Sequence, residues 1–163
     1  MKKALLLFLL LTLPLLIFSG LYFLDKVYFL CPIEYKRDVI IRSDSQGDGF
    51  FAANRSGRRI HEGIDLFAEI GTPVLASRSG RVVAATQNHG MGKYLVIQHS
   101  NSIRTIYGHL SKINVNKNQF VRQGQIIGSV GKTGNANYRD ILPHLHFEVK
   151  KDGIPQDPLE YLR

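Results

Sequence analysis

Residues 142–149 read LPHLHFEV, an alternation of polar and apolar side chains that is typical of a half-buried β-strand. A strand has a period of two, so its polar face carries His144, His146 and Glu148. The opposite face is apolar and predicts burial against a core. Two imidazoles on one strand face can both reach a single metal-centred site, although a solvated polar face explains the same pattern equally well.

A second pair of candidate ligands lies upstream, where residues 61–66 read HEGIDL. If this segment is a strand, His61, Gly63 and Asp65 share one face, and Ile64 and Leu66 face the core. One imidazole and one carboxylate are donors that zinc accepts, and the glycine between them has no side chain to crowd a metal. A surface His-Asp pair in an ordinary strand is the alternative interpretation.

Three further histidines are harder to interpret from spacing alone. His109 ends the β-type run IYGHL at residues 106–110, and a lone histidine of this kind is more often structural than catalytic. His89 lies in a glycine-rich turn, and His99 ends another apolar run. For His89 and His99 a structural role is expected.

The rest of the chain favours an all-β fold. Short runs rich in Val, Ile and Tyr are separated by glycine, and no segment reads as a long amphipathic helix. Such spacing predicts a β-sandwich or barrel-like domain. The predicted strands are residues 39–41, 72–76, 80–86, 93–99, 103–110, 125–130 and 144–150.

The N-terminal segment is apolar. Ala4 to Leu24 carries no charge, follows Lys2 and Lys3, and as a helix would span roughly 30 Å, the thickness of a hydrocarbon core. Residues 1–24 are interpreted as an uncleaved signal anchor in preference to a cleaved signal peptide, because the small-residue site at Ser19-Gly20 is poor. Either interpretation places the remainder outside the cytoplasm, membrane-anchored or secreted. Residues 25–46 are expected to form a tether and first strand, and residues 47–163 one domain.

The net charge indicates which binding partners to expect, and the cysteine content limits disulfide formation. The net charge is +8, which favours an anionic neighbourhood such as acidic lipid headgroups or cell-wall polymer, and an exported chain does not meet nucleic acid. The single cysteine, Cys31, excludes an internal disulfide. The bulky residues before it argue against lipid attachment.

The motifs gain specificity from their order, H-x-G-x-D, then Y-x-H-L, then P-H-L-H-F-E. In this combination the chain resembles the lysostaphin-type or LytM-like zinc metallopeptidase family. The similarity extends to GTPVLA at 71–76, GRVV at 80–83, VIQH at 96–99, VRQGQIIG at 121–128 and GKTG at 131–134, and covers about residues 47–160. It implies an antiparallel β-sandwich or barrel-like domain, the duplicated hybrid motif, with a narrow groove over the metal.

The resemblance also implies roles for individual residues. Zn²⁺ would be held by His61, Asp65 and His146, and the catalytic histidines would be His109 and His144. The implied reaction is hydrolysis of an amide bond in a peptidoglycan stem peptide or cross-bridge. The alternatives are a zinc-binding but non-catalytic cell-wall binding or activator module, and a zinc endopeptidase that acts on proteins.

For some residues around the implied groove, the sequence is consistent with more than one role. Glu148 could orient a histidine ring or form a cross-strand salt bridge, and the second was preferred. Basic residues just before His61, among them Arg55, could bind substrate carboxylates or form a solvated loop. The candidate substrate-binding residues are Arg58, Arg59, Tyr107 and Asn135. The segments 88–92 and 135–142 depart from the family pattern, so they leave the substrate preference open.

Overall fold

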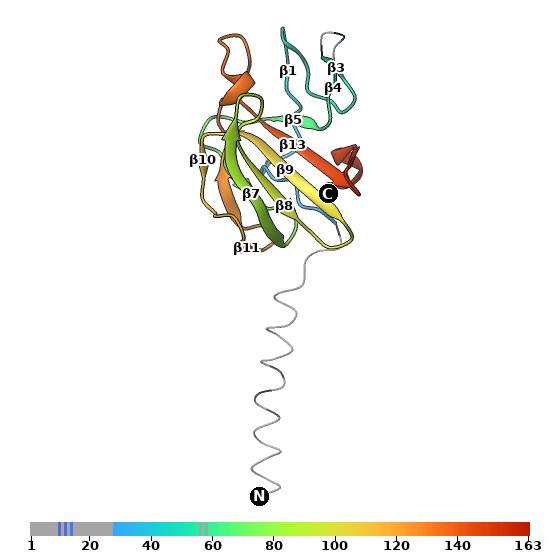
Figure 1. Ribbon diagram of the computed structural model, residues 1–163, viewed down its shortest axis with the longest axis vertical. Helices are drawn as coiled ribbons and strands as arrows, with labels where there is room; N and C mark the ends of the chain where they lie inside the picture. Colours follow the sequence, from blue (N-terminus) through green and yellow to red (C-terminus); the bar gives the residue numbers. More distant parts are fainter. Residues whose placement is uncertain (1–9, 11, 13, 15–27, 56, 58) are drawn as a thin grey trace, which may run out of the picture.

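The strands form two main sheets in the computed structural model, which describes residues 10, 12, 14, 28–55, 57 and 59–163 (Figure 1). The predicted membrane segment falls almost entirely outside these residues, and Arg58 is outside them too. Within the described part of the chain, no helix is both long enough and apolar enough to cross a membrane.

The larger sheet is antiparallel and has the order β11-β7-β8-β9-β13-β14, with β5 paired to the first half of β13. Its strands are β7 (Gly80–Asn88), β8 (Gly92–Gln98), β9 (Ile103–Leu110), β13 (His144–Lys151), β5 (Ile64–Phe67), β11 (Phe120–Val121) and β14 (Ile154–Gln156). Because β13 lies between β5 and β9, residues of three adjacent strands meet at its N-terminal half.

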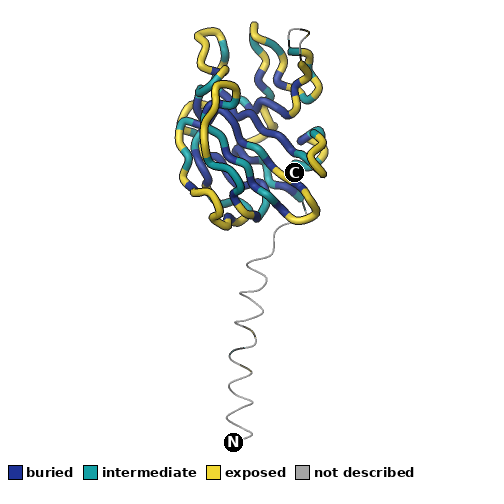
Figure 2. The backbone as a smooth tube through the Cα atoms, viewed as in Figure 1, coloured by how far each residue is buried: buried dark blue, intermediate teal, exposed yellow. Residues whose placement is uncertain are grey.

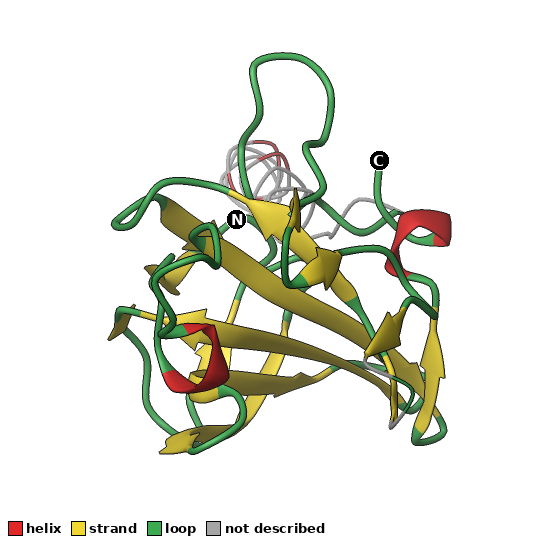
Figure 3. Ribbon diagram, turned by 90° about the horizontal axis from the view of Figure 1, so that it is seen from above, coloured by secondary structure: helices red, strands yellow, loops and turns green. Residues whose placement is uncertain are grey.

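The smaller sheet has the order β10-β12-β6 and covers the apolar face of the larger one. Its strands are β10 (Lys112–Ile113), β12 (Ile126–Ser129) and β6 (Pro73–Leu75). One cluster of buried side chains includes Val74 and Ile127 from this sheet and Leu95 and Phe147 from the larger sheet. Seen from above, strands lie on two sides of a common core (Figure 3). The predicted all-β, sandwich or barrel-like architecture is therefore confirmed.

Most predicted strands are confirmed, with ends shifted by at most two residues. The strand expected at residues 39–41 is wrong, because only Ile41 makes a bridge, to Leu66, while Val39 and Ile40 are exposed. Their β-branched side chains find no core to pack against, so propensity alone does not form a strand there.

Two short hairpins and two short helices complete the fold. The first hairpin joins β1 (Ser43–Asp44) to β2 (Gly47–Asp48), and the second joins β3 (Asn54–Arg55) to β4 (Arg59–Ile60). The 3-10 helices are η1 (Gly134–Ala136) and η2 (Pro158–Glu160). Both hairpins and the segment that contains η1 rise from the same end of the domain (Figure 1). The tip of the first hairpin and the turn that follows η1 are exposed, whereas the strands beneath them are largely buried (Figure 2).

Residues 28–33 pack onto this domain. Phe29 and Ile33 belong to the hydrophobic core, with 3% and 2% of their surface exposed. Phe29 bridges to Leu162 near the C-terminus and makes edge-on ring contacts with His99 and Tyr161. Part of the segment interpreted as a tether therefore contributes to the core of the domain.

Candidate metal centre and its groove

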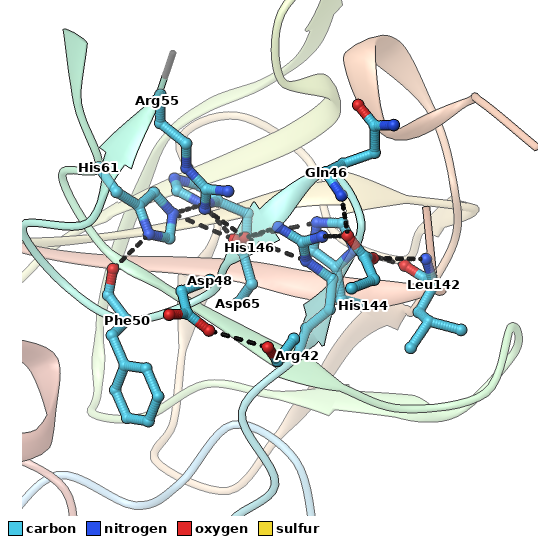
Figure 4. Close-up of polar contacts among 12 residues, drawn as sticks. Arg42, Gln46, Asp48, Phe50, Arg55, His61, Asp65, Leu142, His144 and His146 are labelled. Atoms are coloured by element: carbon cyan, nitrogen blue, oxygen red, sulfur yellow. Dashed lines mark hydrogen bonds and ion pairs between the residues drawn. The ribbon is translucent and has the colours of Figure 1, made fainter. Parts of the chain in front are cut away.

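The structure brings His61, Asp65 and His146 together at the N-terminal half of β13 (Figure 4). Asp65 on β5 lies directly opposite His146 on β13, and His61 enters from the loop before β5. His146 Nδ1 lies 2.9 Å from Asp65 Oδ1 and 3.0 Å from His61 Nε2, and the last pair, His61 Nε2 and Asp65 Oδ1, is 3.1 Å apart. Three donor atoms on three side chains therefore converge on one point.

These donors fit a zinc ion. A tetrahedral zinc site with bonds of about 2.0–2.1 Å spaces its ligand atoms about 3.3 Å apart, close to the separations seen here. The second nitrogen of each ring is already engaged: His61 Nδ1 lies 2.8 Å from the Phe50 carbonyl oxygen, and His146 Nε2 lies 2.9 Å from Glu148 Oε1. Such partners fix the tautomer that directs the remaining nitrogen at a metal.

Burial and hydrogen bonds act in opposite directions on the pKa values of His146 and Asp65. Burial alone would lower the pKa of His146, but hydrogen bonds to Asp65 and Glu148 raise that pKa to about 9. Burial would raise the pKa of Asp65, but hydrogen bonds from His146 and His61 hold it well below its usual range. Without a metal, the ring of His146 thus carries a proton that a cation would displace.

His109 and His144 stand beside the three candidate ligands. Their ring centroids are 5.0 Å apart, and His109 is 5.8 Å from the ring of His146. His109 Nδ1 donates to the Thr133 carbonyl at 2.9 Å, and His144 Nδ1 donates to the Leu142 carbonyl at 2.7 Å. In both rings these bonds leave Nε2 available as a proton acceptor.

Both of these imidazoles are held neutral. Burial, with repulsion from His144 and His146, lowers the pKa of His109 to about 3. Burial also lowers the pKa of His144, against the attraction of Asp65. A neutral ring keeps a lone pair on Nε2, which a group that orients or deprotonates a water molecule needs.

A backbone irregularity points His109 at the site. Tyr107 faces the core, so regular alternation would turn His109 to the core as well. Instead, the pairing of β8 with β9 shifts register between Lys93 and Leu95, and His109 has a φ of 61°. A bulge with one residue in the left-handed region changes the direction of a side chain, at an energetic cost that is typical of functional sites.

Two arginines bind the far oxygen of Asp65. Arg42 Nη2 lies 2.9 Å and Arg55 Nη2 lies 2.6 Å from Asp65 Oδ2, while Oδ1 faces the histidines. The sequence places Arg55 among the candidate residues of the groove entrance, whereas nothing in the sequence singles out Arg42. Its partner lies 23 residues away on β5, and no local pattern reveals such a pair.

Two neighbouring residues have roles that sequence spacing only partly indicated. Glu148 binds His146 as described, which agrees with a role in orienting that ring. Its ion pair is with Lys150 Nζ, at 3.1 Å on the same strand, so the cross-strand salt bridge is wrong. Gly63 does not simply leave room for a metal. A Cβ there would collide with the carbonyl oxygen of Phe147, so glycine is required by the close approach of two strands.

The site lies in a groove of about 980 Å³. Arg59 lines it from the second hairpin, and Asn135 lines it from η1. Tyr107 does not reach it: this side chain is fully buried, and its hydroxyl bonds to Ser77 N and Thr105 Oγ1, so the prediction that it contacts substrate is wrong.

The two remaining histidines differ from each other. His99 is buried and bonded to Ser79 O and Thr105 Oγ1, as expected for a structural residue. His89 is exposed and lines the groove, and the structural role expected for it stays a prediction. Its glycine-rich turn could have indicated this exposure.

Comparison with known proteins gives a consistent result. Residues 59–158, more than half of the chain, match the model of peptidase family M23. The chain is 48% identical over 101 residues to the peptidoglycan DD-endopeptidase ShyA of Vibrio cholerae and 41% identical over 110 residues to lysostaphin of Staphylococcus staphylolyticus. These alignments cover 61% and 64% of this chain but only 22% of each relative, so the chain spans about a fifth of their length.

A solved structure described as a zinc-containing peptidase from Vibrio cholerae has the same fold. The TM-score is 0.65 at 35% identity, over 79% of this chain and 38% of the other. The family match, the curated relatives and this structure agree with the resemblance seen in the sequence. The chain belongs to peptidase family M23.

Proposed function

We propose that this protein is a zinc-dependent endopeptidase that hydrolyses amide bonds in peptidoglycan stem peptides or cross-bridges. The observation that carries the proposal is the convergence of five side chains, His61, Asp65 and His146 as ligands with His109 and His144 beside them. Three protein ligands that leave a fourth position open are the arrangement of a catalytic zinc site, whereas structural sites are closed.

Three residues would bind the metal, and two histidines would transfer protons. Zinc bound by the three ligands would polarise the scissile carbonyl and lower the pKa of water from about 15.7 to about 7. His109 and His144, both neutral, are suited to accept the proton of the attacking water and to return one to the leaving amine. The carbonyls of Thr133 and Leu142 hold both rings in the tautomer that this requires.

The groove supports a peptide substrate. Arg59, whose side chain is exposed, and Asn135 line it from different segments and are proposed to contact the substrate. Arginine binds carboxylates in a forked geometry, and stem peptides carry carboxylates. Because peptidoglycan lies outside the cytoplasm, we propose that the domain acts there, with residues 1–24 as the membrane anchor or export signal.

A zinc-binding but non-catalytic module is the rival proposal. It predicts bound zinc without turnover. The presence of both His109 and His144 in the neutral state, with Nε2 free of the carbonyl partners, supports the enzyme instead, because a binding module has no need of two proton acceptors beside its metal.

Two variants on one strand face separate these proposals. The 163-residue chain, solubilised in detergent and loaded with zinc, is incubated with cross-linked muropeptides, and new peptide termini are identified by mass spectrometry. His144→Ala is expected to retain zinc and lose turnover, whereas His146→Ala loses both. Zinc-loaded wild-type protein that releases no termini would refute the enzyme and favour the binding module.

A further inference from the structure

We propose that Arg42 and Asp44 are positioning residues that couple the zinc ligand Asp65 to His144. Both residues precede the segment that matches the family, residues 59–158, so the family relationship does not assign them a role. The inference rests on the proposed function for what zinc and His144 do. It makes the first hairpin, which carries Asp44, a part of the active site.

The coupling begins at the carboxylate of Asp65. Two nitrogens of Arg42 donate to the same oxygen, Asp65 Oδ2: Nη2 at 2.9 Å and Nε at 3.3 Å. Its third nitrogen, Nη1, lies 2.6 Å from Asp44 Oδ1. One guanidinium therefore holds two carboxylates at once, and Oδ1 of Asp65 stays turned toward His61 and His146 (Figure 4).

The coupling continues through the backbone before β13. The second oxygen of Asp44, Oδ2, accepts a hydrogen bond from the Leu142 amide at 3.0 Å. The carbonyl of Leu142 accepts the Nδ1–H of His144 at 2.7 Å. Asp44 thus holds the backbone of Leu142, the residue whose carbonyl orients His144, and a continuous series of contacts runs from Asp65 to His144.

Burial makes these contacts strong and their loss costly. The side chains of Arg42, Asp44 and Asp65 are exposed by only 3%, 7% and 4%. Screening by water is weak there, and removing one member leaves a buried charge without its partner. Arg55 also binds Asp65 Oδ2, at 2.6 Å, but among the described residues its one ion pair is with Asp65. Arg42 alone connects that ligand to Asp44.

The hairpin supplies a matched control. Asp48 lies opposite Ser43 in the same hairpin, is exposed, and accepts a hydrogen bond from the Ser43 hydroxyl at 2.8 Å. Asp44→Ala and Asp48→Ala remove the same groups from the same element. Each variant removes one hydrogen bond within the hairpin, from Gln46 N to Asp44 Oδ1 at 2.9 Å or from the Ser43 hydroxyl to Asp48 Oδ1, so a loss of hairpin stability affects both.

The test uses the 163-residue chain in detergent. We measure zinc affinity by chelator competition, hydrogen exchange of the Leu142 amide, and kcat and KM on cross-linked muropeptides. Loss of a group that supports a metal site typically costs roughly 10–100-fold in affinity or activity. Asp44→Ala is expected to lower kcat by that factor, leave KM nearly unchanged and speed exchange of the Leu142 amide. Asp48→Ala is expected to match wild type in zinc affinity, in exchange of the Leu142 amide and in both kinetic constants.

Arg42 variants test the other half of the coupling. Arg42→Gln is expected to weaken zinc binding by roughly 10–100-fold. Arg42→Lys keeps the charge, but one ammonium lacks the fork that spans both carboxylates, so it should resemble Arg42→Gln. Full recovery by Arg42→Lys would overturn the proposal. Should Arg42→Gln fail to fold, Asp44→Ala and Asp48→Ala decide by themselves.

The outcomes separate this inference from the proposed function. If wild-type protein binds zinc without turnover, the proposed enzyme fails, but zinc affinity and Leu142 exchange still test the coupling. If Asp44→Ala and Asp48→Ala have the same zinc affinity and the same Leu142 exchange rate, Asp44 does not position the site and the inference is refuted.

Discussion

Zinc binding is expected to displace a proton from His146, and the affinity for zinc should therefore depend steeply on pH. In the zinc-free protein, Asp65 and Glu148 outweigh burial and raise the pKa of His146 to about 9. A metal ligand must be deprotonated. Between pH 7.5 and 8.5 the apparent dissociation constant should fall about tenfold, or about 1.4 kcal/mol, and level off above about pH 9.

The stability of the zinc-free protein should change in the opposite direction. The folded pKa of about 9 lies above the unfolded value of about 6.5, so the folded state binds the proton more tightly. This contribution to stability is complete below about pH 6.5 and is lost as the pH rises through about 9. Between about pH 6.5 and about pH 9, the free energy of unfolding of the zinc-free protein therefore falls while the affinity for zinc rises.

Calorimetry measures both quantities. Titration of zinc in two buffers of different ionisation enthalpy at pH 7.5 should show release of close to one proton for each ion bound. In Glu148→Gln one of the two carboxylates that raise the pKa is neutral, so proton release should be smaller. No proton release by wild-type protein, with equal affinity at pH 7.5 and 8.5, would refute the assignment of His146 Nδ1 as a ligand.

Three substitutions test the fold and the division of roles. Phe29→Ala should lower the free energy of unfolding by about 3–5 kcal/mol in denaturant titrations, because it empties a buried site; an effect below 1 kcal/mol would contradict its place in the core. Gly63→Ala should lower the melting temperature, since its Cβ meets the Phe147 carbonyl, whereas Gly90→Ala, with its nearest neighbour at 3.7 Å, should not. His109→Ala should lower kcat by roughly 10²–10⁴-fold with zinc content unchanged, and loss of the metal would argue for a ligand instead.

Strand periodicity predicted the part of the site that lies on regular structure. The alternation in residues 142–149 placed His144, His146 and Glu148 on one face, and the apolar face packs into the core as expected. It could not show that Asp65 lies opposite His146, because strand pairing joins residues 81 positions apart. The family resemblance, and not the spacing, brought these residues together before the structure was known.

Other features escaped prediction for local physical reasons. Alternation would have placed Tyr107 and His109 on the same core-facing side, and it is the bulge with its positive φ that separates them. A bulge of this kind has no clear sequence pattern when the left-handed residue is not glycine. Arg42 and Asp44 act through contacts with residues distant in sequence, so only the folded chain reveals them.

If one zinc ion makes this domain a peptidoglycan endopeptidase, as proposed, its activity should follow a titration of the metal-free protein with zinc. The 163-residue chain is stripped with a chelator and mixed with purified peptidoglycan, and zinc is added in steps while released peptide termini are counted by mass spectrometry. The account predicts no release without metal and a rise that saturates at one zinc for each chain. Full release from the stripped protein, or none at saturating zinc, would contradict it.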